Sequence, residues 1–284
     1  MPRHRFIKIQ ACVPTSRRLL LPPGRIGVPV ERPVHSEVMV KIFSRAEELE
    51  SLRKRFAGRR STLVYGPGGV GKTLLLRHVM AEFGNVLYCP ASPSPQAVFR
   101  CLAGLLAARQ DVTVARICRG RTDALAGKSS VALKGIVCDA LRAHEYQVVL
   151  DHLLRPSAAM AAMAGELMVS CSTPVIAVAR SAHMEDAGHL SPLLPDRGER
   201  LAIRNFDSDR AKAFALEVSG QQHVEARNLP GVLDSIARSS EGNPGAILRM
   251  IAMAKHGKYR SGDQIKFAPL YVDFLMETAA ANAI

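Results

Sequence analysis

The sequence predicts an α/β protein in which a parallel sheet is flanked by helices and followed by a small helical domain. Short apolar segments alternate with segments of helical periodicity between about residues 61 and 204, which is typical of a parallel sheet covered on both faces. One of these strands runs directly into a glycine-rich loop and a helix. Beyond residue 206 only helical patterns continue. We therefore expect a Pro-rich arm over 1–40, a core over 41–206 and a helical domain over 207–284.

The composition fits a folded protein whose charge is unevenly distributed. Of the 284 residues, 48% are hydrophobic and 22% are charged, close to the values of globular proteins, so disorder of the whole chain is excluded. The chain has 38 Lys and Arg against 25 Asp and Glu, and no acidic residue precedes Glu31. Such a basic arm either binds phosphate groups, for example on nucleic acid, or is a solvated tail. Both interpretations stay open.

Neither a targeting signal nor a membrane span is expected. The longest apolar run near the start, Leu19–Leu21, is followed by two prolines and is too short for a secretory signal. No run approaches the roughly 18 apolar residues of a membrane helix. The six cysteines form no metal-ligand spacing and are interpreted as reduced thiols. We therefore expect a cytoplasmic protein.

The elements follow from periodicity, caps and breakers. Five prolines between 14 and 33 disfavour helices and central strands in the arm. Ser44 and Glu47 form a capping-box pattern, which predicts a helix from Ser44 to about Phe56. Another helix should follow the glycine loop and end near Phe83, and the basic stretch after residue 108 should be irregular. The remaining expected strands are 61–65, 85–89, 146–150, 174–179 and 200–204, and the remaining expected helices are 95–108, 130–143, 158–169, 207–218, 229–239, 244–256 and 268–281.

Residues 66–73, GPGGVGKT, satisfy the pattern G-x-x-x-x-G-K-[ST] of a phosphate-binding loop. Glycines let the backbone amides turn toward a phosphate at the N-terminus of the next helix. Lys72 supplies a charge for the β- and γ-phosphates, and the Thr73 hydroxyl is a ligand for Mg²⁺. The residues expected to contact the nucleotide here are Gly66, Pro67, Gly68, Gly69, Val70, Gly71, Lys72, Thr73 and Leu74.

Magnesium also needs a carboxylate at the tip of a buried strand. Asp151 follows the apolar run Val148–Leu150 and is the expected partner of Thr73. Asp139 is the alternative, but its apolar neighbours fall on one helical face, which is typical of a surface residue on a helix. The sequence thus predicts Mg²⁺ at Thr73 and Asp151.

These motifs resemble the AAA+ and STAND branches of P-loop ATPases, in particular archaeal-type ATPases with an initiator-like lid, over roughly residues 42–256. Residues 42–49, IFSRAEEL, are similar to the segment that borders the adenine in those families, which places Phe43 and Arg45 there. No N-K-x-D guanine signature follows a later strand, which favours ATP over GTP. The resemblance implies binding of ATP and ADP with Mg²⁺ and a nucleotide-dependent homo-oligomer.

Further positions take roles from the same resemblance. Arg180, after the segment PVIAVA, matches the tip of the sensor-1 strand, or it is a surface residue at a strand end. Arg197, in the segment DRGER, lies where many AAA+ proteins carry an arginine finger, or it forms a surface ion pair. The turn Gly242-Asn-Pro-Gly245 resembles the lid turn that brings Pro244 to the nucleotide, or it exists for backbone reasons. Gly245 replaces the sensor-2 arginine of initiator-like relatives, and Arg249 lies one turn later as a substitute.

The residue after Asp151 departs from the family pattern. Motor-type relatives have a glutamate there to activate the attacking water, whereas this chain has His152. Neutral imidazole can accept a proton, but we expect slow hydrolysis. The sequence therefore predicts an ATPase that couples Mg-ATP binding to conformational change or self-assembly. Two alternatives stay open: a DNA-associated adaptor using the arm and the basic stretch 109–128, and a regulatory switch with little hydrolysis.

Overall fold

The computed structural model describes residues 43–118, 125, 127–194 and 197–282, together with the backbone of 9–10 and 37–38. The chain divides into two units, residues 1–45 and residues 46–284. In the smaller unit, β1 (Ile9–Gln10) pairs antiparallel with β2 (Glu37–Val38). The rest of the expected basic arm lies outside the described residues.

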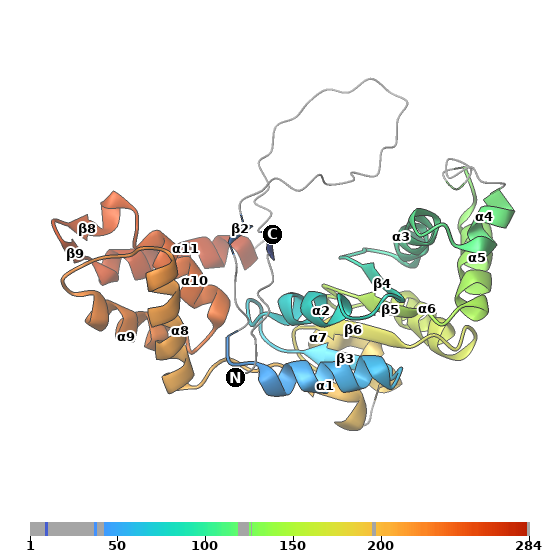
Figure 1. Ribbon diagram of the computed structural model, residues 1–284, viewed down its shortest axis with the longest axis horizontal. Helices are drawn as coiled ribbons and strands as arrows, with labels where there is room; N and C mark the ends of the chain where they lie inside the picture. Colours follow the sequence, from blue (N-terminus) through green and yellow to red (C-terminus); the bar gives the residue numbers. More distant parts are fainter. Residues whose placement is uncertain are drawn as a thin grey trace, which may run out of the picture. The chain divides into compact units, whose positions relative to one another are not determined.

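The larger unit is built on a five-stranded parallel sheet with flanking helices (Figure 1). Its strands lie in the order β4-β5-β6-β3-β7. They are β3 (Thr62–Tyr65), β4 (Val86–Cys89), β5 (Gln147–Leu150), β6 (Val175–Ala179) and β7 (Arg200–Ala202). Every residue of β5 and of β6 is buried, because a strand covered on both faces needs a continuous apolar run rather than an alternating one. The predicted α/β fold class is confirmed.

The helices of the first two thirds of the chain include all of those predicted and some that were not. They are α1 (Ala46–Ala57), α2 (Lys72–Met80), α3 (Pro95–Ala108), α4 (Val112–Cys118), α5 (Ser130–Ala143), α6 (Ala158–Val169) and α7 (Met184–Ala187), followed by the 3₁₀ helices η2 (Gly188–Leu193) and η3 (Arg197–Glu199). The bounds of α3, α5 and α6 are those predicted. Each starts after a serine whose hydroxyl accepts a hydrogen bond from the third helical amide, which satisfies one of the free donors at a helix start.

Two local predictions are wrong. The helix expected from Ser44 begins at Ala46, and Ser44 has a φ of 50°, whereas a capping serine takes an extended backbone. The stretch after residue 108, expected to be irregular, contains α4. Asp111 caps this helix, since its Oδ1 accepts hydrogen bonds from the amides of Thr113 (3.0 Å) and Val114 (3.1 Å).

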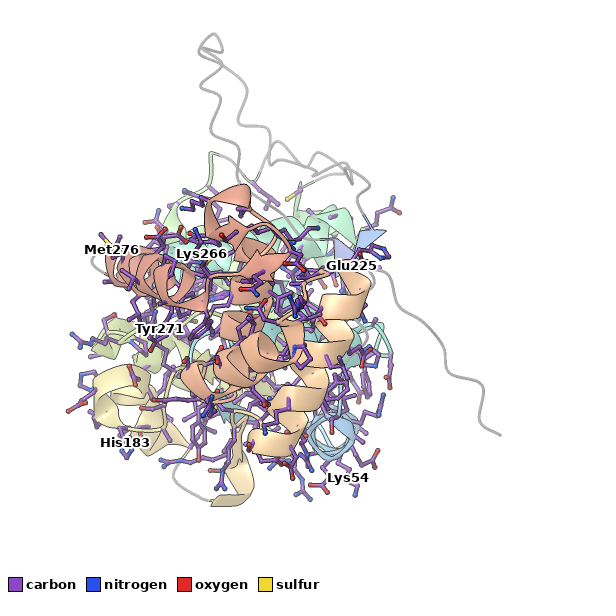
Figure 2. The ribbon with its side chains drawn as sticks, turned by 90° about the vertical axis from the view of Figure 1, so that its left-hand side faces the viewer. Lys54, His183, Glu225, Lys266, Tyr271 and Met276 are labelled. Carbon is purple, nitrogen blue, oxygen red and sulfur yellow. The ribbon has the colours of Figure 1, made fainter. Side chains whose placement is uncertain are left out.

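Helices dominate the chain after the sheet ends at Ala202, as predicted. They are α8 (Ser208–Gln221), α9 (Leu229–Ser239), α10 (Pro244–Met253) and α11 (Phe267–Asn282). Between the last two lie η4 (Gly257–Tyr259) and the hairpin of β8 (Arg260–Ser261) and β9 (Gln264–Ile265), which the sequence did not predict. Met276 of α11 is 67% exposed and lies at the edge of the view in Figure 2. Among the described residues, no helix is both long and apolar enough to cross a membrane.

Candidate nucleotide site

The phosphate-binding loop joins β3 to α2 at the carboxyl edge of the sheet. Gly71 precedes α2 with a left-handed φ of 100° and makes no side-chain cap. The first amides of α2 therefore have no capping side chain, and such amides form a positive site for an anion. The start of the loop is held by neighbouring strands: the Gly66 amide donates to the Arg180 carbonyl (3.1 Å). A Cβ at Gly66 would lie 2.0 Å from the Ile203 carbonyl oxygen, so only glycine fits.

Lys72, the first residue of α2, folds back onto its own loop. Its Nζ donates to the carbonyl oxygens of Gly66 (2.5 Å) and Pro67 (2.9 Å). Burial lowers the pKa of Lys72 to about 8; the Asp151 charge opposes this shift and the Arg180 charge adds to it. A phosphate would give the ammonium group an anionic partner in place of two neutral carbonyls, and such a hydrogen bond is stronger.

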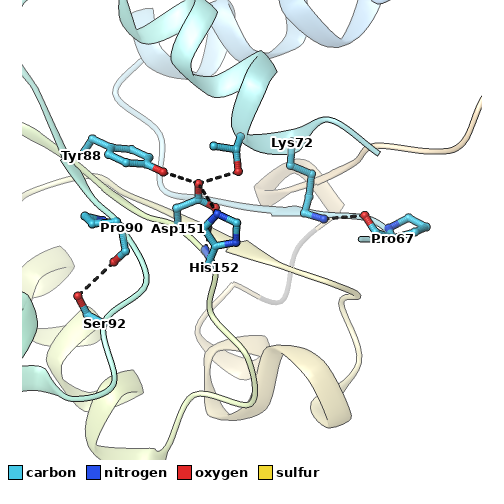
Figure 3. Close-up of polar contacts among 8 residues, drawn as sticks. Pro67, Lys72, Tyr88, Pro90, Ser92, Asp151 and His152 are labelled. Carbon is cyan, nitrogen blue, oxygen red and sulfur yellow. Dashed lines mark hydrogen bonds and ion pairs between the residues drawn. The ribbon is translucent and has the colours of Figure 1, made fainter. Parts of the chain in front are cut away.

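Asp151 directly follows β5 and receives hydrogen bonds on both carboxylate oxygens. Its side chain is 1% exposed. The hydroxyls of Thr73 (2.8 Å) and Tyr88 (2.7 Å) donate to Oδ2, and the amide of His152 donates to Oδ1 (2.7 Å) (Figure 3). A hydroxyl beside a carboxylate is the oxygen donor set that Mg²⁺ prefers, so Thr73 and Asp151 fit this cation.

The imidazole of His152 lies near the carboxylate of its neighbour Asp151. Its Nε2 is 3.6 Å from Asp151 Oδ2, and its side chain is 61% exposed. The residue has a φ of 54°, a costly conformation for a residue with a Cβ, and such outliers cluster at functional sites. His152 lines two cavities, one of about 410 Å³ beside the phosphate-binding loop and one of about 360 Å³.

These groups surround one cavity of about 410 Å³, which is in the range of small-molecule sites. Arg180, at the end of β6, contributes a second cation to the wall that holds Lys72. The residues of the cavity that bear on the chemistry are Gly69, Lys72, Thr73, Asp151, His152 and Arg180. An anion in this cavity meets two cations, free helix amides and a carboxylate able to hold a metal.

The turn at the start of α10 contacts the outer side of the same loop. The Asn243 side-chain amide donates to the Gly68 carbonyl (2.8 Å), and the Gly245 amide donates to the Gly69 carbonyl (3.0 Å). Asn243 also caps α10, because its Oδ1 accepts from the Ala246 amide (3.1 Å). The C-terminal helices are therefore linked to the phosphate-binding loop by direct hydrogen bonds.

Two solved structures resemble the chain over most of its length. The Walker-type ATPase of Pyrococcus abyssi matches 85% of this chain and 74% of its own, with a TM-score of 0.59 and 17% identity. The Orc1 protein of Aeropyrum pernix, solved in complex with DNA, matches 84% of this chain and 66% of its own, with a TM-score of 0.58 and 16% identity. No family model matches the sequence, and neither does any curated protein.

At identities of 16–17%, the likeness to these two structures shows the fold. The chain has the P-loop NTPase fold. The strand order explains how this core assembles its site: β6 lies between the strand of the phosphate-binding loop and the strand that precedes Asp151. Because the strands are parallel, the residues that follow β3, β5 and β6 meet at one edge. Lys72, Asp151 and Arg180 therefore come together although they are far apart in sequence.

Other residues that the sequence predicts to contact the nucleotide do not line this cavity, or their position relative to it is not described. Phe43 and Arg45 belong to the unit 1–45, so their place beside the adenine stays a prediction. Arg197 starts η3, but its side chain is outside the described residues. Pro244 is buried as the first residue of α10 and does not line the cavity.

Arg249 is engaged within the C-terminal helices instead of reaching the cavity. Its guanidinium donates to Glu277 (2.5 Å) and lies over the Phe274 ring, 5.7 Å from the centroid. The proposal that Arg249 substitutes for the sensor-2 arginine is not supported in this arrangement. Asp139, the alternative metal ligand, lies on α5 and pairs with Arg142 (3.2 Å), so Asp151 stays the predicted ligand.

Sequence reasoning missed Tyr88 and Asn243. Tyr88 pairs in register with Val149 in the adjacent strand, and side chains two apart in a strand share a face. Tyr88 therefore faces the same side as Asp151, which the strand predictions allow once β4 and β5 are known to be neighbours. Burial, followed by the hydrogen bond to Asp151 and its charge, raises the pKa of Tyr88 to about 12, although Arg77 opposes the shift.

Proposed function

We propose that this chain is an ATPase that binds Mg-ATP in the cavity beside residues 66–73. The observation that carries the proposal is the hydrogen bond between Thr73 Oγ1 and Asp151 Oδ2 (2.8 Å) next to the Lys72 ammonium group. These three groups supply a metal ligand, its supporting carboxylate and a phosphate cation, as phosphoryl transfer requires. Mg²⁺ bound there would neutralise charge on the phosphate oxygens.

We further propose that hydrolysis is slow. His152 stands where a glutamate would orient the attacking water, and its imidazole lies against Asp151 at 3.6 Å. A side chain turned toward the metal ligand holds a water molecule less well than a free carboxylate does. General bases contribute about 10²–10⁴-fold to a rate, so a poorly placed base leaves ATP bound for long periods.

ATP binding is proposed to change the contact between the phosphate-binding loop and the C-terminal helices. Asn243 and Gly245 bind the carbonyls of Gly68 and Gly69, whose neighbouring amides would face the phosphates. A change in the loop would therefore pass directly to α10. Nucleotide-dependent self-assembly, with Arg197 reaching the site of the next subunit, and a cytoplasmic location belong to the same proposal.

The test compares Asp151→Asn with Asp139→Asn. Both variants remove one negative charge, but Asp139 is an exposed residue of α5, at 59%. Asp151→Asn should bind ATP with little dependence on Mg²⁺, whereas Asp139→Asn should keep the magnesium dependence of the parent. Calorimetry with and without Mg²⁺ measures both. If Asp151→Asn retained full magnesium dependence, the proposed metal site would be wrong.

A second candidate function, a DNA-associated ATPase, is favoured by the likeness to an Orc1 protein solved with DNA and by the basic sequence before Glu31. The stretch 109–128 supports it less than its charge suggests. Arg109 donates to the carbonyls of Gly84 (2.9 Å) and Val86 (2.5 Å), which occupies its guanidinium. Arg116 is exposed, whereas Arg119 and Arg121 lie outside the described residues.

A further inference from the structure

The side chain of Tyr88 reaches from β4 to the carboxylate that ends β5. Its hydroxyl donates to Asp151 Oδ2 at 2.7 Å (Figure 3), a short hydrogen bond of the charge-assisted kind. We propose that Tyr88 is a positioning residue that holds the Asp151 carboxylate ready for Mg²⁺. This inference rests on the proposed function, because it assigns Tyr88 a part in the same metal site.

The Asp151 carboxylate depends on its protein donors because it has little access to water. Its side chain is 1% exposed, and a buried carboxylate without hydrogen bonds is strongly disfavoured. Oδ1 is held by the amide of its neighbour His152 (2.7 Å). Oδ2 is held by two hydroxyls from different elements, Thr73 of α2 and Tyr88 of β4.

Tyr88 is the donor that stays in place when the metal binds. Thr73 is itself a proposed ligand, so its hydroxyl must serve the cation and the carboxylate together. Tyr88 serves the carboxylate alone, and its ring is packed under the Arg77 guanidinium of α2, 5.4 Å from the centroid. The hydroxyl therefore approaches Oδ2 from a fixed direction. Without it, Oδ2 keeps only the Thr73 hydroxyl, which must also serve the cation.

Partners that hydrogen-bond a metal ligand typically change metal affinity by about 10–100-fold. Tyr88→Phe removes the hydroxyl and keeps the ring, so we expect about tenfold weaker Mg²⁺ binding in the presence of ATP. ATP binding without Mg²⁺ should be unchanged, because Tyr88 does not line the nucleotide cavity. Mn²⁺, followed by electron paramagnetic resonance, should show the same loss without any measurement of activity.

Tyr146→Phe is the matched control. Tyr146 also donates to a buried aspartate, Asp111 (3.1 Å), but it lies just before β5, at the strand's other end from Asp151. Tyr146→Phe should bind Mg²⁺ as the parent does. The protein used is the full chain, and a melting curve for each variant reports folding.

Three results would overturn the inference: Tyr88→Phe binding Mg²⁺ and Mn²⁺ as tightly as the parent, Tyr88→Phe losing ATP without Mg²⁺ as well, or Tyr88→Phe failing to fold. The last two would make Tyr88 a structural residue. A parent protein that binds ATP without any magnesium dependence would instead contradict the proposed function. The two failures are therefore distinguishable.

Discussion

Replacement of Gly245 by alanine tests the link between the C-terminal helices and the phosphate-binding loop. Gly245 lies in the first turn of α10, and its amide donates to the Gly69 carbonyl at 3.0 Å. A Cβ at this position would lie 2.9 Å from both the Cα and the carbonyl oxygen of Gly69. Those are backbone atoms, so they cannot move aside as the end of a side chain can. The two segments must separate.

The size of the effect follows from these distances. Ordinary contact begins at 3.4 Å, so the turn must withdraw by about 0.5 Å, which stretches the hydrogen bond to about 3.5 Å, the limit for such a bond. A typical protein hydrogen bond contributes about 1 kcal/mol, equal to about a fivefold change in affinity. Alanine is the better helix former by up to about 1 kcal/mol, so the stability of the whole protein should change little while ATP binding weakens.

Calorimetric titration with Mg-ATP measures this prediction, with Gly220→Ala as the control. Gly220 lies in α8, and a Cβ there would meet no atom within 4 Å. We expect about fivefold weaker ATP binding by Gly245→Ala, parental binding by Gly220→Ala, and folded melting curves for both. If Gly245→Ala bound ATP as tightly as the parent, the hydrogen bonds between α10 and the loop would have no part in nucleotide binding.

Three further outcomes are expected. His152→Glu should raise the rate of phosphate release by about 10²-fold, while His152→Ala should change this rate little. If the parent enzyme were fast and His152→Ala inactivated it, His152 would be the catalytic base. Deletion of residues 1–40 should flatten the salt dependence of DNA binding, because fewer phosphate contacts release fewer counterions; an unchanged slope in fluorescence anisotropy would remove the arm from the DNA site. Burial lowers the pKa of Lys72 to about 8 without nucleotide, and phosphates favour its charged form. ATP affinity should therefore fall as the pH rises above 8, because binding then takes up a proton. Calorimetry in buffers of different ionisation enthalpy at pH 9 detects that proton, and an absence of uptake would refute the assignment.

The sequence was sufficient to predict the helices and strands that are marked by a cap or an apolar run within the element itself. The helices α3, α5 and α6 start after Ser94, Ser129 and Ser157, where a cap precedes an apolar helical pattern. The central strands β5 and β6 are continuous apolar runs. By contrast, α4 depends on a buried cap at Asp111, and each strand of the β8–β9 hairpin has only two residues, too few to show a period.

At the candidate site too, features encoded within one segment could be predicted, whereas contacts between distant segments could not. The loop 66–73 is one continuous motif, so its residues could be named directly from the sequence, and Asp151 is marked by the apolar strand before it. The partners that hold these groups come from distant segments: Asn243 is 175 residues from Gly68, and Tyr88 is 63 residues from Asp151. Arg249 shares this difficulty, because its pairing with Glu277 depends on how α10 packs on α11.

Mg-ATP binding by Lys72→Ala tests the central claim most directly. The control is Lys54→Ala, which removes a surface lysine of α1 that is 74% exposed (Figure 2). Loss of a buried charged partner typically costs about 2–5 kcal/mol in binding, so equilibrium dialysis should show ATP affinity reduced by about 30-fold or more in Lys72→Ala. Lys54→Ala should bind as the parent does. A folded Lys72→Ala protein that retained the parent's ATP affinity would contradict the assignment of residues 66–73 as the nucleotide site.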